Sequence, residues 1–93
     1  MADVEVHAAE PAHGRVQSLR VRFKNAPERT IDRDTALAWL AEGHALLTYS
    51  GTAQHPHKGY AIQRVEVDGA FYLRTDTEPA AADHLVFPDG GHH

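Results

Sequence analysis

YAIQRVEVDGAFYLRT, residues 60–75, is the stretch that decides the fold. The Asp-Gly pair at its centre tolerates the positive φ angles of a two-residue turn, and β-branched and aromatic residues flank it on both sides. The sequence therefore predicts a β-hairpin that pairs Val67 with Ala70. Because side chains alternate along a strand, the hairpin has two faces. One face collects Val65 and Tyr72, and the other collects Ile62, Arg64, Glu66, Phe71 and Leu73.

Three further elements are predicted upstream of the hairpin. Residues 15–24 alternate apolar and polar side chains, as a strand with one buried face does. The stretch TIDRDTALAWLAEGH, residues 30–44, indicates a single short helix, with Asp32 as its N-cap and Gly43 just past its C-terminus. Residues 45–50 are an apolar stretch that indicates a second strand.

Together these elements predict an α+β domain over residues 15–88. It has one small antiparallel β-sheet of about four strands, in the order strand, helix, strand, hairpin, packed on one short α-helix. Residues 51–59 are expected to form a loop by their composition. Residues 1–14 show no clear period, so we expect a flexible N-terminal arm. Residues 89–93 are expected to be a C-terminal tail, and its final histidines fit the remnant of a purification tag.

The composition limits the possible functions. The chain has 93 residues and a formal net charge of −4, which suits one domain and argues against bulk nucleic-acid binding. Without cysteine, it offers no disulfide, no thiolate nucleophile and no cysteine metal ligand. We identify no basic leader and no long apolar run, so we expect a cytoplasmic protein without membrane contact. Ser18 and Ser50 lack the surroundings of a nucleophile, so we expect no catalytic residue.

The end of the hairpin and the tail carry a resemblance to a known family. The matching positions are Gly69, Tyr72, Leu73, Arg74 and Thr75, then Asp83, Leu85 and Pro88, with Ala36, Trp39, Leu40 and Gly43 in the helix. With these, residues 16–88 resemble domain of unknown function 3892, a family of small bacterial and phage-associated proteins. The sequence departs from the family pattern at His84 and Phe87. The resemblance implies a similar order of elements and assigns no reaction.

The residues after the hairpin predict a structural clasp. The planar guanidinium of Arg74 suits Asp76, Asp83 or a backbone carbonyl as a partner. Asp83 suits a turn in the tail, because its carboxylate accepts backbone N–H bonds. The clasp residues are Arg74, Thr75, Asp83, Leu85 and Pro88. In an alternative hypothesis, Tyr72, Arg74 and Asp76 form an anion-binding edge.

We expect a non-catalytic binding module that engages a protein partner or a second copy of itself. Two surfaces suit this role, namely an exposed sheet edge and the basic face of the strand over residues 15–24. That face carries Arg20, Arg22 and Lys24. The alternative function is binding of single-stranded nucleic acid or another polyanion by the same basic face.

The chain has eight histidines, and the tightest cluster is His55 and His57 on either side of Pro56. Two imidazoles at this spacing can bind zinc or nickel weakly from an extended segment. No third ligand has a defined spacing, so a solvated loop is the alternative interpretation. We expect no other cofactor.

Overall fold

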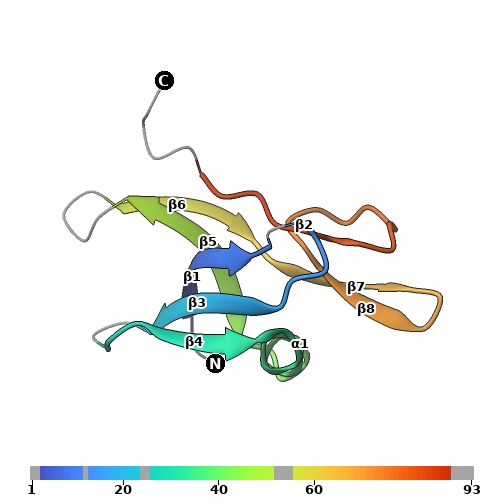
Figure 1. Ribbon diagram of the computed structural model, residues 1–93, viewed down its shortest axis with the longest axis horizontal. Coiled ribbons are helices and arrows are strands. Elements are labelled where there is room, and N and C mark those ends of the chain that lie inside the picture. Colours follow the sequence, from blue (N-terminus) through green and yellow to red (C-terminus); the bar gives the residue numbers. More distant parts are fainter. Residues whose placement is uncertain (1–2, 12, 24–25, 52–55, 89–93) are drawn as a thin grey trace.

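The computed structural model describes residues 3–11, 13–23, 26–51 and 56–88. Within these described residues, nine strands and one helix form two sheets around a single core (Figure 1). In chain order the elements are β1 Asp3–Glu10, β2 His13–Gly14, β3 Ser18–Phe23, β4 Arg29–Asp32, α1 Arg33–Ala41, β5 Ala45–Gly51, β6 Pro56–Ala61, β7 Gln63–Val67, β8 Ala70–Arg74 and β9 Asp83–His84.

The first sheet has five strands in the order β4-β3-β1-β5-β6. Strand β1 lies at its centre, antiparallel to β3 and parallel to β5. The expectation of a flexible arm over residues 1–14 is therefore wrong for this strand, whose Val4 and Val6 are fully buried. A β-bulge explains why the sequence pattern does not reveal β1 as a strand. The extra residue at His7 shifts the alternation, so Ala9 faces the core after Val6 instead of Ala8.

Strands β6 and β7 are consecutive and belong to different sheets. The chain passes from one sheet to the other at Ile62, whose N–H donates to the Leu46 carbonyl at 2.8 Å. A second bulge lies in β6, where Gly59 and Tyr60 both face Thr48. The buried Thr48 Oγ1 accepts a bond of 2.9 Å from the Tyr60 N–H. Residues 56–59, expected as loop, are therefore strand, while 52–55 lie outside the described residues.

The second sheet has the order β2-β9-β8-β7 and contains the predicted hairpin. Strands β7 and β8 pair Val67 with Ala70 and Val65 with Tyr72, as the sequence predicts. Asp68 and Gly69 have φ angles of 52° and 84°, so both turn residues adopt the left-handed conformation. The hairpin prediction is confirmed in its turn and in its register.

Helix α1 begins and ends as its sequence predicts. Asp32 is the N-cap, and its Oδ1 accepts a bond of 2.8 Å from the Thr35 N–H. At the other end, the N–H of His44 donates to the Trp39 carbonyl and that of Gly43 to the Leu40 carbonyl. This pair of hydrogen bonds requires a residue in the left-handed conformation just past the helix. Gly43 adopts it, with a φ of 98°.

The predicted fold class is wrong. The part of the chain that the structure describes is mostly β with one short helix, and it forms two sheets instead of one four-stranded sheet. Neither sheet is purely antiparallel, because β1 pairs with β5 and β8 with β9 in parallel. The sequence pattern did not predict β1, β4 and β6. The bulge in β1 interrupts its alternation, and β4 leads directly into α1. In β6, Pro56 and Gly59 are residue types typical of loops.

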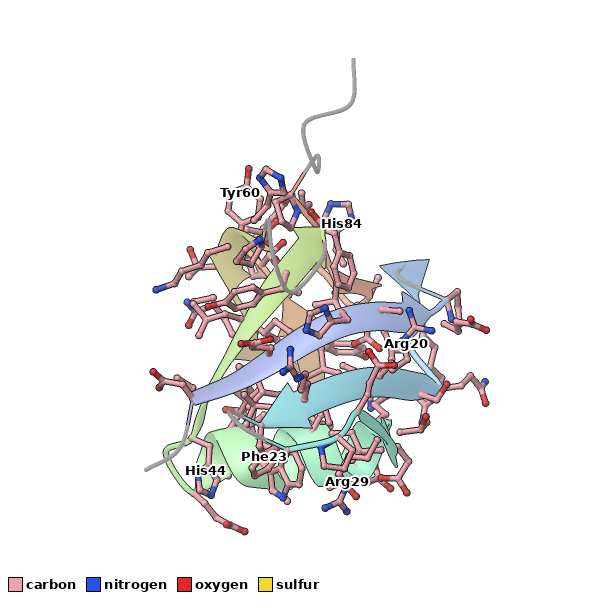
Figure 2. The ribbon with its side chains drawn as sticks, turned by 90° about the vertical axis from the view of Figure 1, so that its left-hand side faces the viewer. Arg20, Phe23, Arg29, His44, Tyr60 and His84 are labelled. Atoms are coloured by element: carbon pink, nitrogen blue, oxygen red, sulfur yellow. The ribbon has the colours of Figure 1, made fainter. Side chains whose placement is uncertain are left out.

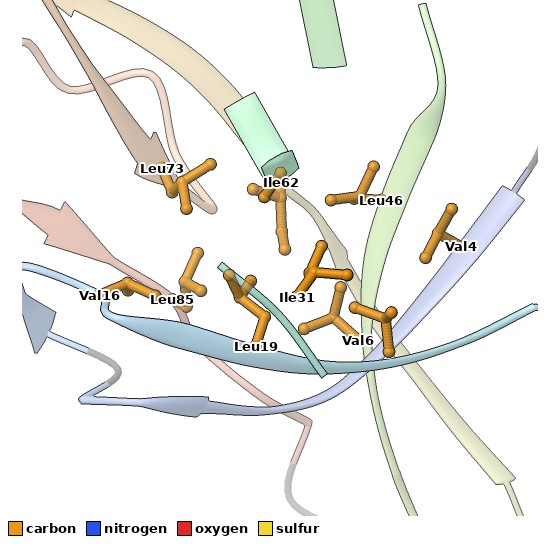
Figure 3. Close-up of a cluster of buried hydrophobic side chains, with 11 residues drawn as sticks. Val4, Val6, Val16, Leu19, Ile31, Leu46, Ile62, Leu73 and Leu85 are labelled. Atoms are coloured by element: carbon orange, nitrogen blue, oxygen red, sulfur yellow. The ribbon is translucent and has the colours of Figure 1, made fainter. Parts of the chain in front are cut away.

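The core joins both sheets to the helix (Figure 3). Its buried apolar residues are Val4, Val6, Val16, Leu19, Val21, Ile31, Ala36, Leu46, Ile62, Leu73 and Leu85. Trp39 packs at the edge of this cluster, where its ring meets Phe23 edge-on at 5.5 Å between centroids. Because Ile62, Leu73 and Leu85 come from the hairpin and its tail, the base of the hairpin is anchored in the common core.

Candidate functional site

The β7–β8 hairpin is an arm that projects beyond the five-stranded sheet (Figure 1). Strand β7 lies at the border of its sheet, since β8 separates it from β9. A two-residue turn makes Val67 and Ala70 a hydrogen-bonded pair, so alternate residues of β7 direct their backbone groups toward β8. The N–H and C=O groups of Arg64 and Glu66 therefore point away from the sheet. Within the described residues, no backbone hydrogen bond joins them to another element.

The surface of the arm combines exposed aromatic and charged side chains. Phe71 is 37% exposed, and the Arg64 guanidinium lies 4.3 Å from the centre of its ring. Glu66 is exposed and lies opposite Phe71 on the same face. Neither Arg64 nor Glu66 forms an ion pair with any other residue that the structure describes. Their charges are thus available to a partner at the edge of β7.

The Asp83 carboxylate holds the base of the arm. It is completely buried and accepts backbone bonds of 2.8 Å from the Val16 N–H and 2.9 Å from the Leu73 N–H. The Arg33 guanidinium donates two more bonds to it, from Nε at 2.8 Å and from Nη2 at 3.0 Å. Burial raises the pKa of the Asp83 carboxyl, but these bonds outweigh it and keep the pKa below its ordinary value.

The side chains of Asp83 and Arg33 bind the backbone groups of β8 that a neighbouring strand would otherwise bind. Strand β9 has only two residues, and its pairing with β8 ends at Arg74. Beyond that point, Asp83 binds the Leu73 N–H and Arg33 Nη2 donates to the Phe71 carbonyl at 2.7 Å. Asp83 accepts backbone N–H bonds as expected, but from Val16 and Leu73 instead of from the tail, so its bonds join β8 to the segment before β3. Arg33 was missed, since an arginine at a helix start carries no distinguishing signal.

Arg74 is the last residue of β8, at the base of the arm, and it is 5% exposed. Its guanidinium donates to the Asp76 carboxylate at 2.6 and 3.1 Å and to the Ala82 carbonyl at 2.8 Å. The bond from Arg74 holds the pKa of the Asp76 carboxyl below its ordinary value. The Arg74 guanidinium is thus occupied within the chain, while the Tyr72 ring lies under Arg33 at 5.7 Å. The structure does not assemble Tyr72, Arg74 and Asp76 around an open anion site.

The remaining clasp residues fasten the tail to both sheets. Thr75 Oγ1 accepts a bond of 3.1 Å from the Val86 N–H, and Leu85 is buried in the core. Pro88 lies against Gly59 of β6, where an added Cβ would collide with it and with Thr48. Residues 83–88 therefore tie the hairpin to the five-stranded sheet. Their importance for stability stays a prediction.

The other sheet edges are poorly suited to accept a strand. Strand β2 has two residues and β4 has four, directly followed by α1. Strand β6 begins at Pro56, exposes Lys58 and contains the bulge at Gly59. Short edges, proline, lysine and bulges are the devices that natural proteins use against edge pairing. Strand β7 has five regularly paired residues and contains no proline, lysine or bulge, although α1 packs against it and Arg64 and Glu66 place charges on it.

The basic face predicted for residues 15–24 is largely neutralised. Strand β3 lies between β4 and β1, and Arg20 is visible on its outer face in Figure 2. Arg20 pairs with Glu28 at 3.2 Å, while Arg22 donates to the Ala26 carbonyl and lies opposite Glu5 of β1. Lys24 lies outside the described residues. A hollow on this face includes the acidic Asp3 and Glu5 in its lining.

Of the two histidines predicted to bind a metal, the structure describes only His57. His55 lies outside the described residues, and His57 belongs to β6, opposite Ser50. The described part of the chain holds no group of three histidine, aspartate or glutamate residues arranged to bind a metal ion. Tyr60 and His84 lie at the end of the molecule away from α1, whereas His44 lies beside it (Figure 2). A zinc or nickel site stays a prediction.

Searches against family models, curated proteins and solved structures return no match for this chain. The resemblance to domain of unknown function 3892 stays a prediction. Within the described residues, no helix has the length and apolar character needed to span a membrane.

Proposed function

We propose that this protein is a non-catalytic interaction module that binds a protein partner along the outer edge of β7. The observation that carries the proposal is the contrast between sheet edges. The edges at β2, β4 and β6 are short or interrupted, while β7 presents the outward backbone groups of Arg64 and Glu66 on a regular strand. An extended segment of a partner can add to such an edge through main-chain hydrogen bonds.

The side chains of the arm suit this mode of binding. Alternate residues of an added strand would lie over the two faces of the hairpin. On one face they meet Phe71 and the charges of Arg64 and Glu66. On the other they meet Val65 and Val67, which are half-buried. An arm fixed at its base by Asp83 and Arg33 loses little conformational freedom on binding, which favours affinity.

A proline substitution at the outer edge tests the proposal. Because the Glu66 N–H points away from β8, Glu66→Pro should remove one donor for the partner and leave the β7–β8 ladder intact. The matched control is Glu66→Gln, which keeps the N–H and removes the charge. Each protein would be immobilised, and retention of a partner from cell extract compared by quantitative mass spectrometry. Retention with the wild type and its loss with Glu66→Pro supports the proposal, and equal retention by both contradicts it.

The alternative of polyanion binding has less support. It requires free cations on β3, but Arg20 is paired with Glu28 and Arg22 is bonded to a backbone carbonyl. The acidic Asp3 and Glu5 lie on the same face and would repel phosphates.

A further inference from the structure

We propose that the partner of the β7 edge is a second copy of this chain, paired antiparallel with Val65 on the twofold axis. The inference rests on the proposed function, since it names the partner of the same edge. It follows from the positions of two opposite charges on one short strand, which make the edge complementary to itself. Closed, twofold dimers of this kind use the same surface on both subunits.

The backbone restricts the pairing to a few registers. Only Arg64 and Glu66 direct their hydrogen-bonding groups outward within β7, as the hairpin register requires. Two antiparallel copies must therefore oppose these residues to each other. If Val65 faces Val65 of the second copy, Arg64 of each chain faces Glu66 of the other. Both outward residues on each strand then exchange N–H···O=C bonds with the second copy.

The charges select this register among the possible ones. A shift that places Arg64 opposite Arg64, or Glu66 opposite Glu66, brings like charges together across the strands. Directly opposed like charges destabilise a strand pair, and opposite charges stabilise it. Within the described residues neither side chain has an ion-pair partner in its own chain. The second copy would supply both missing partners at once.

The aromatic side chain beside the edge supports the same arrangement. The Arg64 guanidinium carbon lies over Phe71, 4.3 Å from the ring centre, which holds the side chain on the face where Glu66 also lies. Contact with the ring does not use up the five N–H donors of the guanidinium, so donors stay available for a carboxylate. On the opposite face, the half-buried Val65 would contact its equivalent at the axis. The two four-stranded sheets would continue through the dimer as one sheet.

Charge exchange between two variants tests the inference. In Arg64→Glu each chain carries two acids on the edge, and in Glu66→Arg each carries two bases. Alone, both variants should dimerise at least about tenfold more weakly than the wild type, because like charges face each other. Mixed in equal amounts, they should form a heterodimer, since every facing pair is then opposite in sign. The double variant Arg64→Glu with Glu66→Arg should form homodimers again.

The readout is sedimentation velocity at low and physiological salt, with native mass spectrometry to identify the heterodimer. Thermal unfolding of each variant shows whether it is folded, and the double variant guards against a loss of fold in either single one. A wild type that stays monomeric up to ~100 μM at both salt concentrations overturns the inference. Dimers that both single variants form as well as the wild type overturn it too, since the contact then lies elsewhere.

The outcome also separates this inference from the proposed function. If the wild type is monomeric but Glu66→Pro still abolishes retention of a different protein, the edge is a binding surface and only the second copy is excluded. If Glu66→Pro affects neither dimerisation nor retention, both proposals fail.

Discussion

Strands β6 and β7 are separated in the chain only by Ile62, yet their outer edges differ in construction. Strand β6 begins at a proline, exposes a lysine and bulges at Gly59, so its backbone groups do not form a regular row. Strand β7 pairs with β8 without irregularity and exposes the backbone of Arg64 and Glu66. The difference indicates that one edge is protected from pairing and the other is left able to pair.

The largest effect is expected at the base of the arm, on which the open edge depends. Asp83→Ala leaves the Arg33 charge and the N–H groups of Val16 and Leu73 without their acceptor. Breaking a buried ion pair on one side typically lowers the free energy of unfolding by about 3–5 kcal/mol. We expect a loss of this size in urea denaturation followed by circular dichroism.

The control for Asp83→Ala is Asp34→Ala, an exposed acid in the first turn of α1. It should lower stability by less than about 1 kcal/mol, because among the described residues the exposed carboxylate interacts only with the helix N-terminus and the charge of Arg33. Equal effects of the two substitutions would show that Asp83 does not anchor the arm.

The next largest loss of stability is expected where a substitution removes an inward N–H group of β7. Val65→Pro removes an N–H that is directed toward Tyr72 in the ladder, leaving a carbonyl of β8 unpaired. We expect the free energy of unfolding to fall by about 1–3 kcal/mol. Glu66→Pro, one residue away, should cost clearly less, because its N–H faces outward. Similar losses for the two variants, measured by thermal unfolding, would contradict the assignment of the open edge.

A larger residue at Gly59 should disturb the edge strand β6. Gly59→Ala places a Cβ against Thr48 and Pro88, so the tail or the bulge must shift. Overpacking of this kind typically lowers stability by about 1–3 kcal/mol. Lys58→Ala on the same strand should change stability little, because its side chain is exposed. Amide hydrogen exchange of residues 85–87 would show whether Gly59→Ala loosens the tail, as we expect.

Arg74→Ala separates the clasp from the anion-binding hypothesis. The guanidinium bonds Asp76 and the Ala82 carbonyl, so its removal should lower Tm by about 4–8 °C, which corresponds to about 1 kcal/mol in a domain of this size. An unchanged Tm would contradict a structural role. Lys58→Ala, which removes an exposed charge from β6, again provides the comparison.

Acid should destabilise the protein partly through Asp83. Its carboxyl has a pKa below the ordinary value in the folded chain, so the unfolded chain takes up the proton at a higher pH. Stability from this group is therefore full well above pH ~4 and is lost as the pH falls through the folded-state value. Urea denaturation from pH 7 to pH 3 should show a smaller acid-dependent loss for Asp83→Asn than for the wild type. Parallel pH profiles would show that Asp83 is not responsible.

Local chemistry made part of the fold predictable. The hairpin turn and register follow from the Asp-Gly pair and its flanking residues, and both helix ends follow from Asp32 and Gly43. Strand β1 was not predictable in the same way, because its bulge removes the period that marks a strand. Strand β6 was likewise predicted as a loop, because Pro56 and Gly59 are typical loop residues.

The candidate site depends on contacts that short-range patterns do not contain. Arg33 and Asp83 are 50 positions apart in the chain, and nothing near either residue indicates the other. The charges of Arg64 and Glu66 were visible on one face of the hairpin, but the open edge follows from the order of strands across the sheet. That order is set by the pairing of β9 with β8 and with β2, which is distant in the chain, so the basic strand looked like the better surface.

Amide hydrogen exchange of Arg64 and Glu66 tests most directly whether the β7 edge pairs with a second copy. The exchange rate of each amide would be measured by NMR at several protein concentrations, with Val65 and Val67 as internal controls. The account predicts that Arg64 and Glu66 exchange rapidly in dilute solution and become protected as concentration rises, while Val65 and Val67 are protected throughout. Rapid exchange of Arg64 and Glu66 at every concentration would contradict pairing of this edge with itself.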